Sequence, residues 1–215
     1  CRPDVYVAVS PVGYAWAKKN AFGIRIAYIP YGVDFDQFKD VQPADIPLKK
    51  PVVLCVGAFL PYKRIELLIK AMKYVKNASL LVIGHGTLEG KLTEMGKQIL
   101  GKRFMLKTGV THTMLTGYYK AANIFSLPSA QSEAFGIVYV EALAAGLPVV
   151  APRDENRQAI VGSAGLLVEV EDSQKYAEAI TSALKKDFGK LPVLQAQQFS
   201  WNTIAAQYEK LLIDL

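Results

Sequence analysis

Two glutamates stand out in an otherwise apolar stretch of the sequence. From Ala134 to Pro152 the only charged residue is Glu141, and Glu133 lies eight positions before it. A carboxylate in so apolar a run is costly to bury unless it meets hydrogen-bond donors or the hydroxyls of a ligand. Gly136 marks the expected start of a helix. The spacing therefore predicts a ligand site made by a loop that holds one acid and a buried helix that holds the other.

The chemistry that suits this spacing is the binding of a nucleotide. Phe135, Gly136 and Ile137 would present the first free N–H groups of the helix, which bind a phosphate well. Glu141 follows about a turn and a half later, at roughly 1.5 Å per residue, which is the scale of a ribose. Its carboxylate can accept from two neighbouring hydroxyls. Glu133 would face the group beyond the phosphates. A purely structural alternative stays open, in which Glu141 pairs with an internal lysine or arginine.

A second candidate lies where the apolar run Val52–Gly57 ends. Lys63 and Arg64 are adjacent cations at the expected start of a helix, where they oppose the helix dipole but could hold an anion above it. A solvated surface pair is the alternative.

Other motifs are weaker. The glycines of Gly84–Gly90 give G-x-G-x-x-x-G, which nearly matches a dinucleotide fingerprint but lacks its acidic partner, so they predict a close backbone approach. His85 and His112 have no neighbours at metal-ligand spacing and are read as structural or solvent-facing. Asp34 and Asp36 lie among turn formers, so we expect no metal there.

Short apolar segments alternate with helical patterns along most of the chain. This alternation predicts an α/β fold, a Rossmann-like doubly wound parallel sheet covered by helices on both faces. Ligands of such sheets bind in the loops after the strands. The predicted strands are 4–10, 24–29, 52–57, 80–84, 104–107, 124–127, 149–151 and 165–168, and the predicted helices are 11–20, 65–75, 88–100, 113–122, 173–185 and 201–213, besides the one starting at Gly136.

The loops that follow these strands include 153–157, and residues 34–50 read as a polar linker. The last helix places Ile204, Ala205, Tyr208, Leu211 and Leu212 on one apolar face that needs a partner.

Composition narrows the class of protein. With 215 residues, 51% of them hydrophobic, the chain can bury a core. Its net charge of +6 fits an anionic partner, but the basic residues are scattered as pairs, which argues against nucleic acid.

Cys1 and Cys55 do not suggest a disulfide framework, and no segment reads as membrane-spanning, so we expect an intracellular setting. The chain opens at Cys1 without an initiator methionine, and we expect it to be a fragment.

With these motifs, the sequence resembles the C-terminal half of retaining glycosyltransferases of the GT-B fold, family 4. The E-x7-E signature of that family matches Glu133 to Glu141 inside PSAQSEAFGIVYVEALAAGLPVVA. VVLCVGAFLPYKR resembles its strand and phosphate loop, YIPYGVDFDQF its interdomain crossing, and FSW…YEKLL its end. The resemblance covers nearly the whole chain in the right order.

The resemblance implies a domain plan. Residues 1–33 would be the tail of an acceptor-binding domain and the crossing, 34–50 a linker, 51–199 the nucleotide-sugar domain, and 200–215 a C-terminal helix packing toward the missing domain.

It also implies the roles of individual residues. Glu133 and Lys63 would be catalytic, with Lys63 at the donor pyrophosphate, Glu133 near the donor sugar and Glu141 on the ribose. The remaining donor-binding residues would be Gly57, Arg64, Gly84, Thr108, Val110, Phe135, Gly136 and Ile137, with the segment 107–111 beside the base.

The implied reaction is transfer of a hexose from a UDP- or GDP-linked donor, with retention, to a glycan, glycolipid or small-molecule acceptor. No cofactor and no metal is expected, and the protein would be cytoplasmic, with peripheral membrane association through the missing domain. The form Tyr62-Lys63-Arg64 resembles family members that use GDP-mannose.

One departure from the family pattern keeps alternatives open. The family usually has arginine after the glycine of the phosphate loop, where this chain has Ala58, and Arg64 is the cation that could replace it. A non-catalytic nucleotide-binding module is therefore the second hypothesis. An epimerase of the same two-domain fold is the third, and the E-x7-E arrangement disfavours it.

Overall fold

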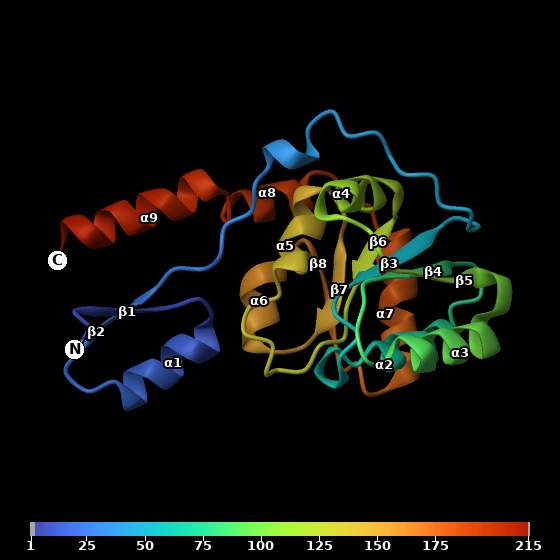
Figure 1. The fold of residues 1–215 in the computed structure, drawn as a ribbon, viewed down its shortest axis with the longest axis horizontal. Coiled ribbons are helices and arrows are strands. Elements are labelled where there is room, and N and C mark those ends of the chain that lie inside the picture. Colours follow the sequence, from blue (N-terminus) through green and yellow to red (C-terminus); the bar gives the residue numbers. More distant parts are fainter. Residues whose placement is uncertain (1–2, 215) are drawn as a thin grey trace.

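The computed structural model describes residues 3–214, so Cys1 lies outside the described residues. A large domain is built around a parallel sheet, and a smaller N-terminal unit lies beside it (Figure 1). We define the N-terminal unit as residues 3–29. No helix of the described chain combines the length and the apolar character needed to cross a membrane.

The sheet of the large domain has six parallel strands in the order β5-β4-β3-β6-β7-β8. Its central strands are mostly apolar, and every residue of β3 and β4 is buried, as expected for a sheet covered on both faces. This confirms the predicted α/β class. The strands are β3 (Val52–Val56), β4 (Ser79–Ile83), β5 (Phe104–Lys107), β6 (Ile124–Ser126), β7 (Val149–Pro152) and β8 (Gly165–Val168).

Two groups of helices cover the sheet. The first group packs together through α2, which contacts both α3 and α7: α2 (Ile65–Met72), α3 (Glu89–Leu100) and α7 (Ser173–Lys185). The second group packs around α5: α4 (His112–Ala121), α5 (Ile137–Ala144), α6 (Glu155–Val161) and α8 (Leu191–Gln197). Between residues 3 and 214 there are also three short 3-10 helices, η1 (Asp36–Phe38), η2 (Pro61–Lys63) and η3 (Gly101–Arg103).

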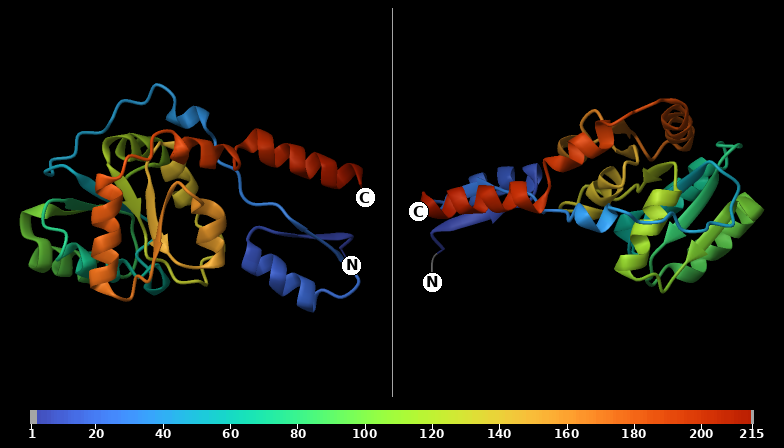
Figure 2. Two further views of the ribbon diagram at one scale, coloured as in Figure 1. Left: turned by 180° about the vertical axis from the view of Figure 1, so that it is seen from behind. Right: turned by 90° about the horizontal axis from the view of Figure 1, so that it is seen from above.

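The N-terminal unit consists of β1 (Val5–Ala8), α1 (Pro11–Asn20) and β2 (Arg25–Tyr28), with the two strands paired in parallel. The last helix, α9 (Trp201–Ile213), leaves the large domain and reaches this unit (Figure 2). There Ile204 and Leu211 are buried against Ile29. The first and last parts of the described chain therefore share one small core.

Two features of the local structure differ from the expectations. Residues 153–157 are not all loop, because Asp154 accepts from the Arg157 amide and α6 begins at Glu155. Helix α8 was not predicted. The apolar residues of α9 lie on one face about 120° wide, at about 100° per residue, as predicted, but only part of it is covered. Ile204 and Leu211 are buried, whereas Ala205 and Leu212 line an exposed hollow.

The segment 34–50 has the irregular structure expected of a linker, but it is packed against the large domain. Phe38 is buried and its ring meets that of Tyr119 edge to face, and the Ala44 amide donates to the Gly117 carbonyl at 2.9 Å. The segment runs over α4 before it enters β3 (Figure 1).

Candidate functional site

The predicted site residues gather at one point of the sheet edge. The chain starts the sheet at β3, moves outward through β4 to β5, and then returns to β6 on the other side of β3. The loops after β3 and β6 therefore diverge to opposite sides of the sheet, which is where ligands of such sheets bind. The loop after β3 contains Lys63, and the loop after β6 contains Glu133.

Lys63 and Glu133 form an ion pair across this point, although they are 70 positions apart in the sequence. Both side chains are largely enclosed, with 9% of Lys63 and 14% of Glu133 exposed. A pair so shielded from water interacts more strongly than a surface pair. The structure thus brings together the two residues that were predicted to be catalytic.

The N-terminus of α5 opens beside this pair. Gly136 precedes the helix in a left-handed conformation (φ 79°), and a Cβ there would stand 2.7 Å from the Tyr139 ring, so glycine is required. Phe135 is buried and Ile137 is partly exposed. No side chain among residues 3–214 caps this helix start. The Tyr139 amide donates to the Gly136 carbonyl at 3.0 Å, so the amides before it are the ones predicted to bind an anion.

Glu141 lies further along α5 and is 5% exposed. The Tyr119 hydroxyl donates to its Oε2 at 2.9 Å, and His112 Nε2 lies 3.9 Å from its Oε1. Burial raises the pKa of Glu141 above 4.5, while the Tyr119 hydrogen bond and His112 act in the opposite direction. The structural alternative for Glu141, pairing with an internal lysine or arginine, is wrong within the described chain.

His112 was read as structural or solvent-facing, and its side chain is indeed 67% exposed. Its contact with Glu141 was missed, because the two residues come from different helices. The sequence feature that could have predicted this contact is the position of His112 in the region after a strand, at the same sheet edge as the other candidate residues.

Arg64 does not hold its guanidinium above the start of α2. Its Nε donates to the Pro128 carbonyl at 2.8 Å and its Nη2 to the Ser129 carbonyl at 3.1 Å, and Nη1 pairs with Glu171. These bonds tie the loop after β3 to the loop after β6. The cation proposed to replace the arginine missing at Ala58 is thus already bound to protein groups.

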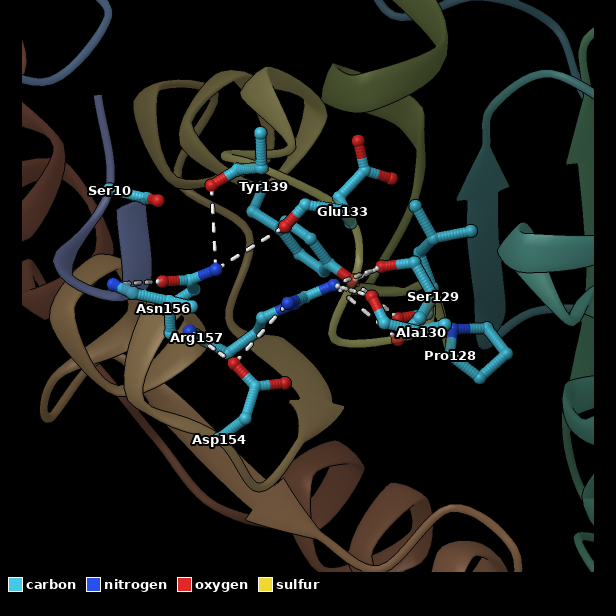
Figure 3. A network of polar contacts seen from close by, with 12 residues as sticks. Ser10, Pro128, Ser129, Ala130, Glu133, Tyr139, Asp154, Asn156 and Arg157 are labelled. Atoms are coloured by element: carbon cyan, nitrogen blue, oxygen red, sulfur yellow. Dashed lines mark hydrogen bonds and ion pairs between the residues drawn. The ribbon is translucent and has the colours of Figure 1, made fainter. Parts of the chain in front are cut away.

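A buried arginine that the sequence did not reveal supports the same loop. Arg157 is fully buried, and its Nη2 donates to Ser129 Oγ at 2.7 Å and to the Ala130 carbonyl at 2.8 Å (Figure 3). Its Nη1 pairs with Asp154 at 3.3 Å. The guanidinium also lies 5.8 Å from the centre of the Tyr139 ring. The Arg157 guanidinium therefore holds the loop that leads to Glu133 in place.

The Tyr139 hydroxyl completes this support by donating to the Leu127 carbonyl at 2.7 Å and contacting Ser129 Oγ at 2.8 Å. Burial is the largest cause that raises its pKa to about 12. The hydroxyl therefore stays protonated and keeps its hydrogen bond throughout the ordinary pH range.

The remaining predicted residues lie further along the edge. Gly57 directly follows β3, and a Cβ there would be 3.8 Å from Lys63 Cδ. A Cβ at Gly84 would stand 1.9 Å from the Gly57 carbonyl oxygen, so Gly84 is needed for the approach of two chain segments. Thr108 and Val110 follow β5, at the outer edge of the sheet, and are not brought to the Lys63–Glu133 pair.

Comparison with known proteins places this geometry in a family. Residues 36–201 match the model of the family described as glycosyl transferases group 1. Phosphatidyl-myo-inositol mannosyltransferase of Mycolicibacterium smegmatis is 30% identical over 215 residues, covering 94% of this chain and 55% of the relative. D-inositol 3-phosphate glycosyltransferase of Mycobacteroides abscessus is 31% identical, covering 86% and 46%. The chain spans about half the length of the curated relatives it matches.

Solved structures share the fold. Sucrose-phosphate synthase from Thermosynechococcus elongatus superposes with a TM-score of 0.82 at 29% identity, over 98% of this chain and 58% of that one. Anabaena Alr3699/HepE in complex with UDP-glucose gives a TM-score of 0.82 at 21% identity, over 99% and 64%. The chain shares the fold of these neighbours, which confirms the predicted fold class. By its match over most of its length, the chain belongs to the glycosyl transferases group 1 family.

Proposed function

We propose that this chain is the donor-binding part of a retaining glycosyltransferase that moves a hexose from a nucleotide-sugar to a glycan, glycolipid or small-molecule acceptor without a metal ion. The observation that carries the proposal is the enclosed Lys63–Glu133 pair beside the uncapped start of α5. It puts a cation and free amides next to a carboxylate, which is what a departing diphosphate and a reacting sugar require.

Each group has a distinct task in this proposal. The α5 amides and Lys63 stabilise the charge that develops on the diphosphate, because Lys63 keeps further N–H donors after its bond to Glu133. Glu133 contacts the donor sugar near the carbon that is transferred. Glu141 accepts from the ribose hydroxyls through Oε1, since Tyr119 already occupies Oε2.

The relatives, rather than the geometry of the site, indicate which nucleotide and which sugar make up the donor. Several of them are named as mannosyltransferases, one of them from Corynebacterium glutamicum as GDP-mannose-dependent. The HepE structure contains UDP-glucose. We therefore propose a GDP- or UDP-linked hexose as the donor, with the whole protein needed for the acceptor.

Calorimetric titration of the chain with UDP, GDP and ADP tests the binding site. We expect one nucleotide to bind selectively, and Glu141→Ala to weaken it roughly tenfold to a hundredfold, because hydrogen bonds to a charged group are lost. Glu94→Ala, at an exposed position of α3, is the control and should leave affinity unchanged. Equal affinity in both variants would contradict the assignment of Glu141 to the ribose.

Nucleotide affinity should also depend on pH through Glu141. Its pKa in the free protein is raised above 4.5, and the ionised carboxylate is the form that accepts from hydroxyls. Affinity is therefore expected to be full above the raised pKa and to fall as the pH drops through it. Calorimetry across this range would show the step, and Glu141→Gln should abolish it. Both proteins carry His112→Gln, because His112 Nε2 lies beside the Glu141 carboxylate.

A non-catalytic nucleotide-binding module is the second candidate. Ala58 favours it, because Arg64 is bound to the 128–129 backbone and Glu171 and no arginine stands at the position after Gly57. The two candidates predict the same nucleotide binding and differ only in turnover.

A further inference from the structure

The side chain of Asn156 joins two parts of the molecule that are far apart in the sequence. We propose that Asn156 is a positioning residue that fixes Glu133 relative to the N-terminal unit. This inference rests on the proposed function, in which Glu133 contacts the donor sugar. It concerns how that carboxylate is held, and by which part of the protein.

Asn156 is 1% exposed, and both ends of its carboxamide are used. Its Oδ1 accepts from the Val12 amide at 3.2 Å, and its Nδ2 lies 3.3 Å from the Glu133 carbonyl and 3.4 Å from the Ala134 carbonyl (Figure 3). One side of the group faces an N–H donor and the other faces two acceptors. Only one orientation of the carboxamide satisfies both sides.

The bond to Val12 fills a specific gap at the start of α1. Pro11 has no N–H to satisfy, Ser10 Oγ accepts from the Gly13 amide, and the Ser10 carbonyl accepts from the Tyr14 amide. Val12 is the first-turn amide that these local bonds leave over, and helix starts need partners for such groups. Asn156 supplies that partner from the large domain, so the start of α1 is completed only when α6 lies against it.

A second contact ties the same loop to the chain crossing. The ring of Tyr31, just beyond the N-terminal unit, meets the Phe135 ring edge to face at 5.6 Å. Phe135 in turn meets Phe199, which precedes α9, at 5.9 Å. The segment that holds Glu133 is therefore anchored on both sides of the crossing. A change in the position of the N-terminal unit would act on the Glu133 and Ala134 carbonyls directly.

The first test uses the chain itself and hydrogen exchange at the Val12 amide. With the nucleotide that the titration identifies, we expect exchange at Val12 to slow in the wild-type chain, because ordering the Glu133 segment stabilises the Asn156 bridge and coupling between two sites is reciprocal. In Asn156→Ala the Val12 amide should exchange faster, and nucleotide should not change its exchange rate. No effect of nucleotide on the wild-type amide, or an effect that persists in Asn156→Ala, would overturn the proposal.

The second test measures transfer by the full-length enzyme. Asn156→Ala is expected to lower kcat about tenfold to a hundredfold, since small displacements of a reacting group have effects of this size. The donor KM and the nucleotide Kd should rise by no more than the factor by which nucleotide slows exchange at Val12 in the wild-type chain, because Lys63 and Glu141 are untouched. A variant that merely misfolds would instead lose nucleotide binding as well.

The conservative variant Asn156→Asp separates the two ends of the bridge. It keeps an acceptor for Val12 but cannot donate to the Glu133 and Ala134 carbonyls, so it should be as slow as Asn156→Ala. Recovery of kcat would show that only the start of α1 matters and would overturn the proposal. Asn123→Ala is the matched control: its Oδ1 accepts from the Val52 amide at 2.8 Å, at the opposite end of the sheet, and kcat should not change.

The failure of this inference can be told from failure of the proposed function. A wild-type protein that binds nucleotide but transfers no sugar refutes the proposed function. Hydrogen exchange at Val12 still tests whether Asn156 links α1 to the Glu133 segment. A wild-type enzyme that transfers sugar while Asn156→Ala keeps its full kcat refutes the bridge alone.

Discussion

Replacing Glu133 with glutamine is expected to lower kcat of the full-length transferase about a hundredfold to a thousandfold, the range found when one preorganised electrostatic group is removed from an active site. Glutamine keeps the shape of the side chain but not its charge. Nucleotide affinity should be equal or higher, because Lys63 loses its protein counter-charge and is free for the diphosphate. Steady-state kinetics with calorimetry would separate the two effects.

The control for this experiment is Glu171→Gln. Glu171 is 62% exposed and pairs with Arg64 rather than with Lys63, so its loss should leave kcat within about twofold. Full turnover in Glu133→Gln would remove this carboxylate from the mechanism. A wild-type protein with no turnover under any donor would favour the non-catalytic module instead.

Replacing Arg157 with methionine should destabilise the chain by about 3 to 5 kcal/mol, the usual result of breaking a buried ion pair. Ser129 Oγ and the Ala130 carbonyl would lose their donor, and Asp154 would lose its buried partner. For a chain of this size the midpoint of thermal unfolding falls by roughly 2 to 4 °C per kcal/mol. Denaturant and thermal unfolding of the chain would measure the effect.

Arg153→Met is the matched comparison, four positions earlier in the same segment. Arg153 pairs with Glu169 at 3.5 Å, but both side chains are more than half exposed, and such pairs contribute about 0 to 1 kcal/mol. If the two variants were equally stable, the buried guanidinium would not be what holds the loop after β6.

The sequence predicted well what depends on local pattern. The apolar strands β3 and β4 were recognisable from their composition alone, and the start of α5 from Gly136. Because parallel strands end at a common edge, the loops that hold Lys63 and Glu133 were both expected at that edge, but no pattern in the sequence predicted that β3 and β6 are neighbours.

The rest of the site depends on contacts between distant segments, which leave no periodic signal. The residues Asp154 to Arg157 are polar and were predicted to be a loop, yet Arg157 and Asn156 are buried because Ser129, Val12 and the Glu133 carbonyl lie around them. Asp154 as a helix cap was the one local sign that a helix starts there.

The packing of helix α9 likewise could not be fully predicted from the sequence. The sequence identifies it as amphipathic, but the side on which Ile204 and Leu211 are covered depends on where β2 lies. Apolar content could therefore be predicted, while the division between a buried and an exposed stripe could not.

The N-terminal unit is closed by the far end of the chain. Ile29 is covered by Ile204 and Leu211, and Arg25 Nη1 donates to the Asp214 carbonyl at 2.7 Å, across a separation of 189 residues. Contacts of such long range form late, because the loop between them must close first. During synthesis on the ribosome, Ile29 would thus be covered by α9 only after the large domain has emerged and folded.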